Sequence, residues 1–177
     1  MKTNPSARYA LLGSMMSGPK HGYEIRRFLD SAFGSTWYVG TSQLYALLRR
    51  LEEKGLLRSS LHAQDTRPPR RVFSLTSEGR GEFLEWVRRP TAHVRDLRIE
   101  FLAKLFFFDR LSLQGAGELI ETQFRILEQV KKTMKRRQEE ESDPYKKLVF
   151  GFKIATVEAW LDWLVTRAKP FVRSAVP

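Results

Sequence analysis

Apolar residues recur at helical spacing near the start of the chain, in segments that end at glycine or proline. Residues 6–17 end at Gly18-Pro19 and carry one apolar side, made of Ala7, Ala10, Leu11 and Leu12. Residues 21–33 are followed by Gly34, and their apolar residues are Tyr23, Ile25, Phe28, Leu29 and Phe33. This spacing and these stop signals predict two short helices.

A third helix is predicted over about residues 41–54. Thr41 is a good N-cap, and Gly55 follows the helix, where a left-handed backbone is common. One side of this helix is a compact leucine stripe of Leu44, Leu47, Leu48 and Leu51. The opposite face carries Ser42, Ala46, Arg49 and Glu53, flanked by Gln43, Tyr45 and Arg50. The helix therefore buries one side and offers a polar face with small residues in its N-terminal half.

Two short strands and a fourth helix are predicted next. The segments "LLRSSLH" (56–62) and "RVFSL" (71–75) flank "TRPPRR", in which two prolines fix φ and remove two backbone donors. This order predicts a β-hairpin whose turn holds out three cations, Arg67, Arg70 and Arg71. Thr76 then caps a helix that runs to about Arg89, with Phe83, Leu84 and Val87 inward.

The second half has fewer breaks, and Pro90 marks the predicted domain boundary. "DLRIEFLAKLFFF" (96–108) predicts an apolar helix. A long helix over about 112–141 has near-heptad apolar residues, interrupted by Gln123, at Leu113, Ala116, Ile120, Leu127, Val130 and Met134. The last helix, about 144–169, has one stripe of Tyr145, Leu148, Phe152, Ala155, Ala159 and Trp163.

A hairpin of two helices cannot enclose such stripes alone, so a partner surface is required. We expect a homodimer whose C-terminal helices bury Ile120, Leu127, Val130, Phe152, Trp160 and Trp163. The predicted fold is mainly α with a small β-hairpin: an N-terminal winged helix-turn-helix at residues 1–90 and an α-helical dimerisation domain at 91–177.

Charge adds a candidate partner. The 177 residues contain 31 Lys and Arg against 20 Asp and Glu, a net charge of +11. Residues 1–89 hold 15 of these cations and 8 of the acids, so the excess is greater in the first half. Such an excess favours a polyanionic partner, because phosphates attract Lys and Arg and release counterions.

The third helix and the cationic turn offer groups suited to duplex DNA. Thr41 and Ser42 provide hydroxyls beside a helix N-terminus, which suits a phosphate. Gln43 can read an adenine edge, Arg49 a guanine edge or a phosphate, and Ala46 a thymine methyl group. The arginines of the turn would meet phosphates or a minor groove. The candidate DNA-binding residues are Thr41, Ser42, Gln43, Tyr45, Ala46, Arg49, Arg67, Arg70, Arg71, His21 and Tyr23. At His21, capping or packing beside Tyr23 is favoured over a phosphate contact.

Other chemistries find little support. The chain has no cysteine, which excludes disulfides, thiol nucleophiles and thiolate metal sites. His21, His62 and His93 lie far apart without carboxylates at ligand spacing, and no phosphate loop or catalytic triad is recognisable. We expect no metal, no cofactor and no enzymatic activity. No apolar run approaches the roughly 18 residues of a membrane span, so a soluble, cytoplasmic protein is expected.

Two alternatives use the same architecture. A winged helix that binds proteins is disfavoured by the turn arginines together with Arg49 and Arg50. An RNA-binding winged helix stays open, although the small-residue face favours duplex DNA. For Trp160, Trp163 and the phenylalanines at 106–108, core or dimer packing is favoured over a ligand pocket.

Three blocks resemble the PadR-type transcriptional regulators: "YALLGSMMSGPKHGYEI" (9–25), "TSQLYALLRRLEEKGLL" (41–57) and "RPPRRVFSLTSEGR" (67–80). "RIEFLAKLFFF" (98–108) is similar to the branch with a long AphA-like C-terminal helical domain. Phe73 stands where the family usually has Tyr, and Gln43 and Ala46 depart from its commoner pattern, so base preference does not carry over. The resemblance implies a homodimeric repressor that binds a pseudo-palindromic operator and is often released by a small, frequently aromatic, effector.

Overall fold

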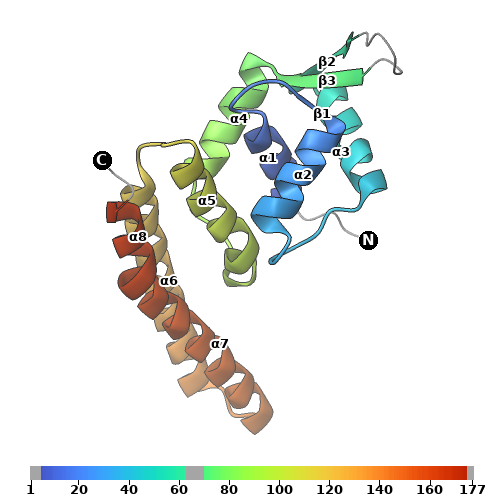
Figure 1. Ribbon diagram of the computed structural model, residues 1–177. Coiled ribbons are helices and arrows are strands. Elements are labelled where there is room, and N and C mark those ends of the chain that lie inside the picture. Colours follow the sequence, from blue (N-terminus) through green and yellow to red (C-terminus); the bar gives the residue numbers. More distant parts are fainter. Residues whose placement is uncertain (1–4, 63–69, 175–177) are drawn as a thin grey trace.

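The computed structural model describes residues 5–62 and 70–174 (Figure 1). Its N-terminal half holds four helices around one apolar core, α1 (Pro5–Ser14), α2 (Gly22–Phe33), α3 (Thr41–Glu53) and α4 (Ser77–Arg88). A three-stranded antiparallel sheet, in the order β1-β3-β2, consists of β1 (Lys20–His21), β2 (Leu57–His62) and β3 (Arg70–Leu75). The predicted helix order and hairpin are confirmed. β1 was not predicted, because two residues are too short to show an alternating pattern.

The observed helix ends agree with some of the predicted capping residues and differ from others. The Thr76 hydroxyl accepts from the Gly79 N–H at 3.0 Å, and Gly55 has φ +72, as predicted for a cap and a left-handed stop. The prediction that Thr41 is an N-cap is wrong: Gly40 is the cap, and Thr41 is the first residue of α3. Gly34 does follow α2, but with a right-handed backbone at φ −57. The first helix ends at Ser14, three residues earlier than predicted.

The apolar segment after residue 90 is not one regular helix. A 3-10 turn, η1 (Val94–Asp96), and a π-helical turn, η2 (Leu97–Phe101), precede α5 (Leu102–Arg110). α5 packs into the N-terminal core through Phe107, which is fully buried and lies edge-on to Phe83 with ring centroids 5.1 Å apart. Phe107 also contacts α1 so closely that a Cβ at Gly13 would lie 2.4 Å from its ring. α5 therefore shares one core with α1 and α4.

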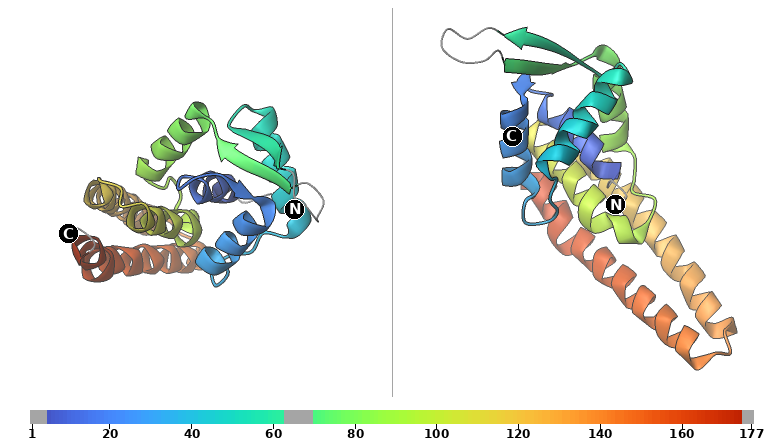
Figure 2. Two further views of the ribbon diagram at one scale, coloured as in Figure 1. Left: turned by 45° about the horizontal axis from the view of Figure 1, so that its top comes forward. Right: turned by 90° about the vertical axis from the view of Figure 1, so that its right-hand side faces the viewer.

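The C-terminal helices form an arm that projects from this body (Figure 2). α6 (Ala116–Glu140) and α7 (Pro144–Trp163) run antiparallel. α7 continues through the π-helical turn η3 (Leu164–Ala168) into α8 (Lys169–Ser174), which packs on α6. α6 begins later than predicted, because Ser112 with φ 49 and Gly115 with φ 105 turn the chain before it. Within the described ranges, no helix is both long and apolar enough to cross a membrane.

Part of the apolar stripe that was predicted to be exposed is buried inside the arm. The inner face of α7 is Ile154, Val157 and Leu161, which Leu164 continues in η3. On α6, Ile120 and Leu127 are only 0% and 1% exposed. These two residues were expected on an exposed surface, but both are buried within the single chain, because the two helices cover one face of each other. Val130, Trp160 and Trp163 are half-buried. The outer face of α7 stays open at Tyr145, Leu148 and Phe152, which are 72%, 70% and 73% exposed.

Candidate nucleic-acid interface

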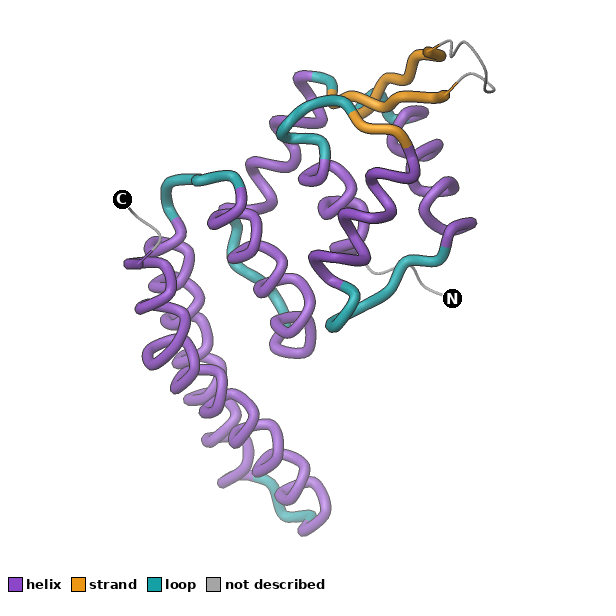
Figure 3. Tube along the Cα trace, in the orientation of Figure 1, coloured by secondary structure: helices purple, strands orange, loops and turns teal. Residues whose placement is uncertain are grey.

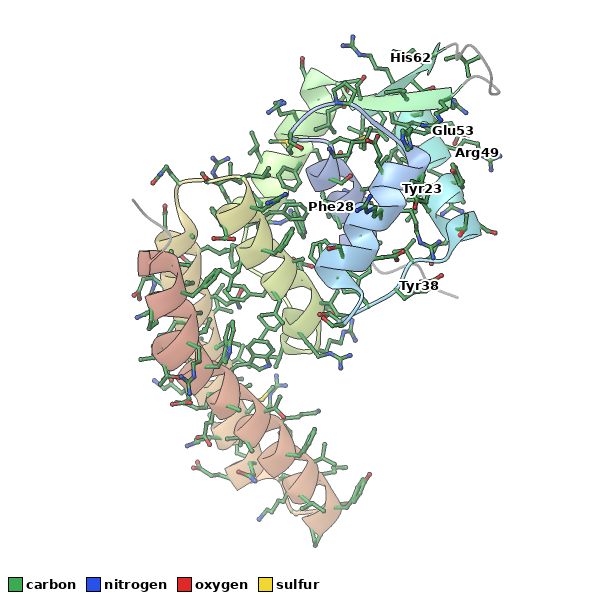
Figure 4. All side chains as sticks on the ribbon, in the orientation of Figure 1. Tyr23, Phe28, Tyr38, Arg49, Glu53 and His62 are labelled. Carbon is green, nitrogen blue, oxygen red and sulfur yellow. The ribbon has the colours of Figure 1, made fainter. Side chains whose placement is uncertain are left out.

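α3 buries its leucine stripe and presents its opposite face outward, as predicted. Thr41, Ser42, Tyr45 and Arg49 are exposed, and Gln43 and Ala46 are half-buried. Figure 4 shows Tyr23, Tyr38 and Arg49 on the side of the body that lies away from α5 and the arm. The N-terminal half of α3 is therefore open to a large partner.

A groove of about 510 Å³ lies between α3 and the hairpin. Its lining comes from both elements, with Ser42, Tyr45, Ala46, Leu48 and Arg49 from α3 and Arg71 and Phe73 from β3. Arg49 is paired with Glu53 at 3.6 Å, but both side chains are well exposed, at 74% and 64%. Since an exposed ion pair of this kind is weak, Arg49 can exchange Glu53 for an anionic partner at little cost.

Arg71 is not the free cation that the sequence suggested. Its guanidinium donates to the Glu52 carboxylate at 2.6 Å and to the Ser59 hydroxyl at 2.8 Å, and it lies over the Phe73 ring. The pKa of Glu52 is lowered, mainly by the hydrogen bond that the Ser59 hydroxyl donates to its carboxylate and further by Arg71. Arg71 therefore fastens the base of the hairpin to the end of α3 while still lining the groove.

The other two turn arginines differ from Arg71. Arg70 is exposed at the first position of β3, opposite His62, and forms no hydrogen bond or ion pair with any described side chain. Arg67 lies outside the described residues. Arg70 is thus a cation of the described hairpin that is available for a phosphate.

His21 and Tyr23 lie at the start of α2, beside α3. The His21 side chain accepts from the Glu24 N–H at 3.4 Å, the Glu24 carboxylate accepts from the His21 N–H at 2.9 Å, and the His21 ring stacks on Tyr23. The capping and packing expected at His21 are both present. Tyr23 is 68% exposed and Tyr45 is 50% exposed. A Cβ at Gly22 would lie 2.7 Å from the Tyr45 hydroxyl, so a glycine is needed there for Tyr45 to approach α2.

Sequence reasoning missed Arg26 and Tyr38. Arg26 donates to Asp30 at 2.8 Å, to the Tyr38 hydroxyl at 2.6 Å and to the Thr41 hydroxyl, so it joins α2 to the start of α3. Asp30 raises the pKa of Arg26. The Thr41 hydroxyl accepts from Arg26 and can still donate its own proton to a phosphate. The spacing of Arg26 and Asp30 was visible in the sequence, whereas nothing there indicated Tyr38, which is 66% exposed.

The described part of the interface offers groups that form hydrogen bonds. In the two ranges that the structure describes, no three His, Asp or Glu side chains gather as a metal would need. Its surface consists of hydroxyl, amide, phenol and guanidinium groups, which hydrogen-bond to bases and phosphates.

Comparisons with known proteins match two families in succession. Residues 11–85 match the transcriptional regulator PadR-like family, and residues 97–166 match the virulence activator alpha C-terminal family. The crystal structure of Bacillus subtilis PadR in complex with operator DNA is 24% identical, covers 93% of this chain and 98% of that one, and has a TM-score of 0.48.

Two curated relatives are similar in sequence. The negative transcriptional regulator PadR of Bacillus subtilis is 29% identical over 118 residues, which are 67% of this chain and 65% of that protein. A probable transcriptional regulator of Mycobacterium tuberculosis is 30% identical over 110 residues, or 62% of this chain and 58% of that protein. The chain thus spans less than two thirds of either relative. Residues 11–85 are therefore a PadR-like transcriptional regulator domain, a virulence activator alpha C-terminal domain follows at residues 97–166, and the chain is homologous to PadR-type regulators.

Proposed function

We propose that the protein is a sequence-specific regulator that binds duplex DNA as a homodimer. The observation that carries this proposal is the open groove between α3 and the hairpin, lined by Ser42, Tyr45, Ala46, Arg49 and Arg71. An α-helix fits the major groove of B-DNA, and small residues such as Ser42 and Ala46 let its backbone approach the bases. Arg70 would meet the phosphate backbone beside the groove.

Dimerisation would supply the second half of the interface. One α3 reaches about one half-site, whereas two joined helices can read a pseudo-palindrome. The partner surface we propose is the row of Tyr145, Leu148 and Phe152 on α7, together with the half-buried Val130, Trp160 and Trp163. An exposed apolar row of this kind is a typical protein interface.

Repression and release by an effector are the finer parts of the proposal. The Bacillus subtilis relative is a negative regulator, which supports repression. An apolar pocket of about 300 Å³ between α5 and α7 is lined by Leu102, Thr156, Ala159, Trp160 and Trp163, and could hold a small aromatic molecule.

DNA binding is tested by selection from a pool of random duplexes, followed by fluorescence anisotropy on the enriched site. We expect an enriched pseudo-palindrome, and Gln43→Ala should change the preferred base while Gln129→Ala, an exposed change on α6, should not. Failure to enrich any duplex, with retention of single-stranded RNA or of a protein partner instead, would refute the proposal.

Effector release is tested with benzoate and indole as aromatic probes. Either probe should quench the fluorescence of Trp160 and Trp163 and release the operator, and Ala159→Leu, which fills the pocket, should prevent both effects. Equal release from both proteins would show that the pocket is not the effector site.

A further inference from the structure

A buried polar network lies where α4, α5 and α6 meet, and neither the groove nor the dimer surface uses it. Three of its side chains are almost completely buried: Thr91 is 1% exposed, Lys104 0% and Gln123 1%. Charged and amide groups are seldom buried so completely unless they are paired, so their partners indicate what the network holds.

Gln123 holds the backbone of Thr91 from two sides. Its side-chain oxygen accepts from the Thr91 N–H at 2.7 Å, and its side-chain nitrogen donates to the Thr91 carbonyl at 3.2 Å. Gln123 lies two turns inside α6, and Thr91 lies in the connection that follows α4. This pair of bonds therefore ties the arm directly to the body.

Lys104 also forms hydrogen bonds with the connection after α4, residues 89–91, to which Gln123 is bonded. Its ammonium donates to the Arg89 carbonyl at 2.7 Å, to the Glu100 carboxylate at 2.5 Å and, more weakly, to the Thr91 hydroxyl at 3.5 Å. It also lies over the Trp86 ring of α4, 5.1 Å from the centroid. Burial lowers the pKa of Lys104, and Glu100 opposes this effect. α5 thereby fixes residues 89–91 in one shape.

Between α5 and α6 runs a short loop that is closed by backbone hydrogen bonds, such as the one from the Leu113 N–H to the Phe108 carbonyl at 2.9 Å. The loop of residues 111–115, seen in Figure 3 between these two helices, contains Ser112 and Gly115, both with positive φ. This loop leads the chain into the first turn of α6, and the directional hydrogen bonds from Gln123 to Thr91 act two turns further along, where they are suited to fix the angle at which α6 leaves the body.

We propose that Gln123 and Lys104 are positioning residues, which set the orientation of the α6–α7 arm relative to α3. The proposal rests on the proposed function for its consequence: in a dimer joined through the arms, this angle sets the separation of the two α3 helices. That separation must match the roughly 34 Å helical repeat of the duplex. Specific polar contacts of this kind can define one geometry even where they add little stability.

The geometry is tested without DNA. The absence of cysteine allows two spin labels at exposed positions, Lys54→Cys after α3 and Glu139→Cys near the end of α6, with labelled chains diluted in unlabelled protein. We expect a narrow distance distribution in the parent and a shifted or clearly broader one in Gln123→Met and in Lys104→Met. Gln129→Met, on the exposed face of α6, is the matched control. If Gln123→Met fails to fold, Lys104→Met gives an independent answer. Distributions that coincide with the parent would overturn the proposal.

DNA binding provides the second readout. In the folded variants, affinity for the full operator should fall about tenfold or more, while affinity for a single half-site should stay within about twofold. A general loss of stability would weaken both equally and would count against positioning. If the parent itself shows no preference for a full operator, the proposed function fails, whereas the distance measurement still decides the role of Gln123 and Lys104.

Discussion

Arg70 and Arg71 are neighbours on β3, yet they have different surroundings. Arg71 is bonded to Glu52 and Ser59, whereas Arg70 forms no hydrogen bond or ion pair with any described side chain. We expect Arg70→Ala to weaken binding to all DNA sequences similarly and to reduce the salt slope of log affinity by about 1, with no change in unfolding. Arg71→Ala should also lower the free energy of unfolding by about 1 kcal/mol. Urea denaturation and salt titrations check both, and equal stability of the two variants would contradict this division.

Glu52 gives the same contact a pH dependence. Its pKa is lowered in the fold by Ser59 and Arg71, so the contact stabilises the protein above the unfolded pKa of Glu and is lost as pH falls through the folded pKa. At pH 7 we expect Glu52→Gln to be less stable by about 1 kcal/mol, and this difference should shrink as the pH is lowered through the folded pKa of Glu52. Denaturation over a series of falling pH values measures it, with Glu53→Gln as the exposed control on the same helix.

The identities of the candidate residues were readable from the sequence, but their partners were not. Helical periodicity placed Ser42, Ala46 and Arg49 on the open face of α3, because that pattern follows from local geometry. The bonding of Arg71 to Glu52, which is 19 residues away, and of Arg26 to Tyr38 depends on tertiary packing. Residue type and spacing do not encode such contacts.

Two glycines of α4 offer a matched pair of substitutions. A Cβ at Gly79 would lie 2.0 Å from the Leu56 carbonyl oxygen, whereas a Cβ at Gly81 would meet nothing within 4 Å. We expect Gly79→Ala to destabilise the protein by at least about 2 kcal/mol, because backbone must move, and Gly81→Ala to stabilise it by up to about 1 kcal/mol. Thermal unfolding of the two variants checks this, and similar melting temperatures would contradict it.

At the scale of elements, helices with clear stop signals were predicted best. Gly55 and Thr76 act through the backbone next to them, so their effects are local and visible in sequence. β1 and the π-helical turn η2 were missed, because β1 exists only through its pairing with β3 and η2 through packing of Leu97 and Phe101 in the core. Ile120 and Leu127 were misplaced for a related reason: periodicity identifies an apolar face but not the helix that covers it.

For the whole molecule, the proposed dimer predicts the effect of a charge on the open face of α7. Phe152→Asp should yield a folded monomer with operator affinity reduced by at least about 100-fold, since Phe152 is 73% exposed within one chain. Lys153→Asp, at the neighbouring exposed position, is the control. Sedimentation and anisotropy measure both properties, and a Phe152→Asp dimer with unchanged affinity would rule out this surface.

The insertion of Phe107 between α1 and α4 determines where the N-terminal domain can be truncated. A fragment that stops at Pro90, the boundary expected from the sequence, would leave open the socket formed by Gly13 and Phe83. We propose that the smallest autonomous fragment of the winged helix extends to Arg110. Limited proteolysis should accordingly release a stable piece that ends in the loop at 111–115. A fragment of residues 1–110 should express as a soluble protein, and one of residues 1–90 should aggregate unless Phe83 is also replaced by a polar residue.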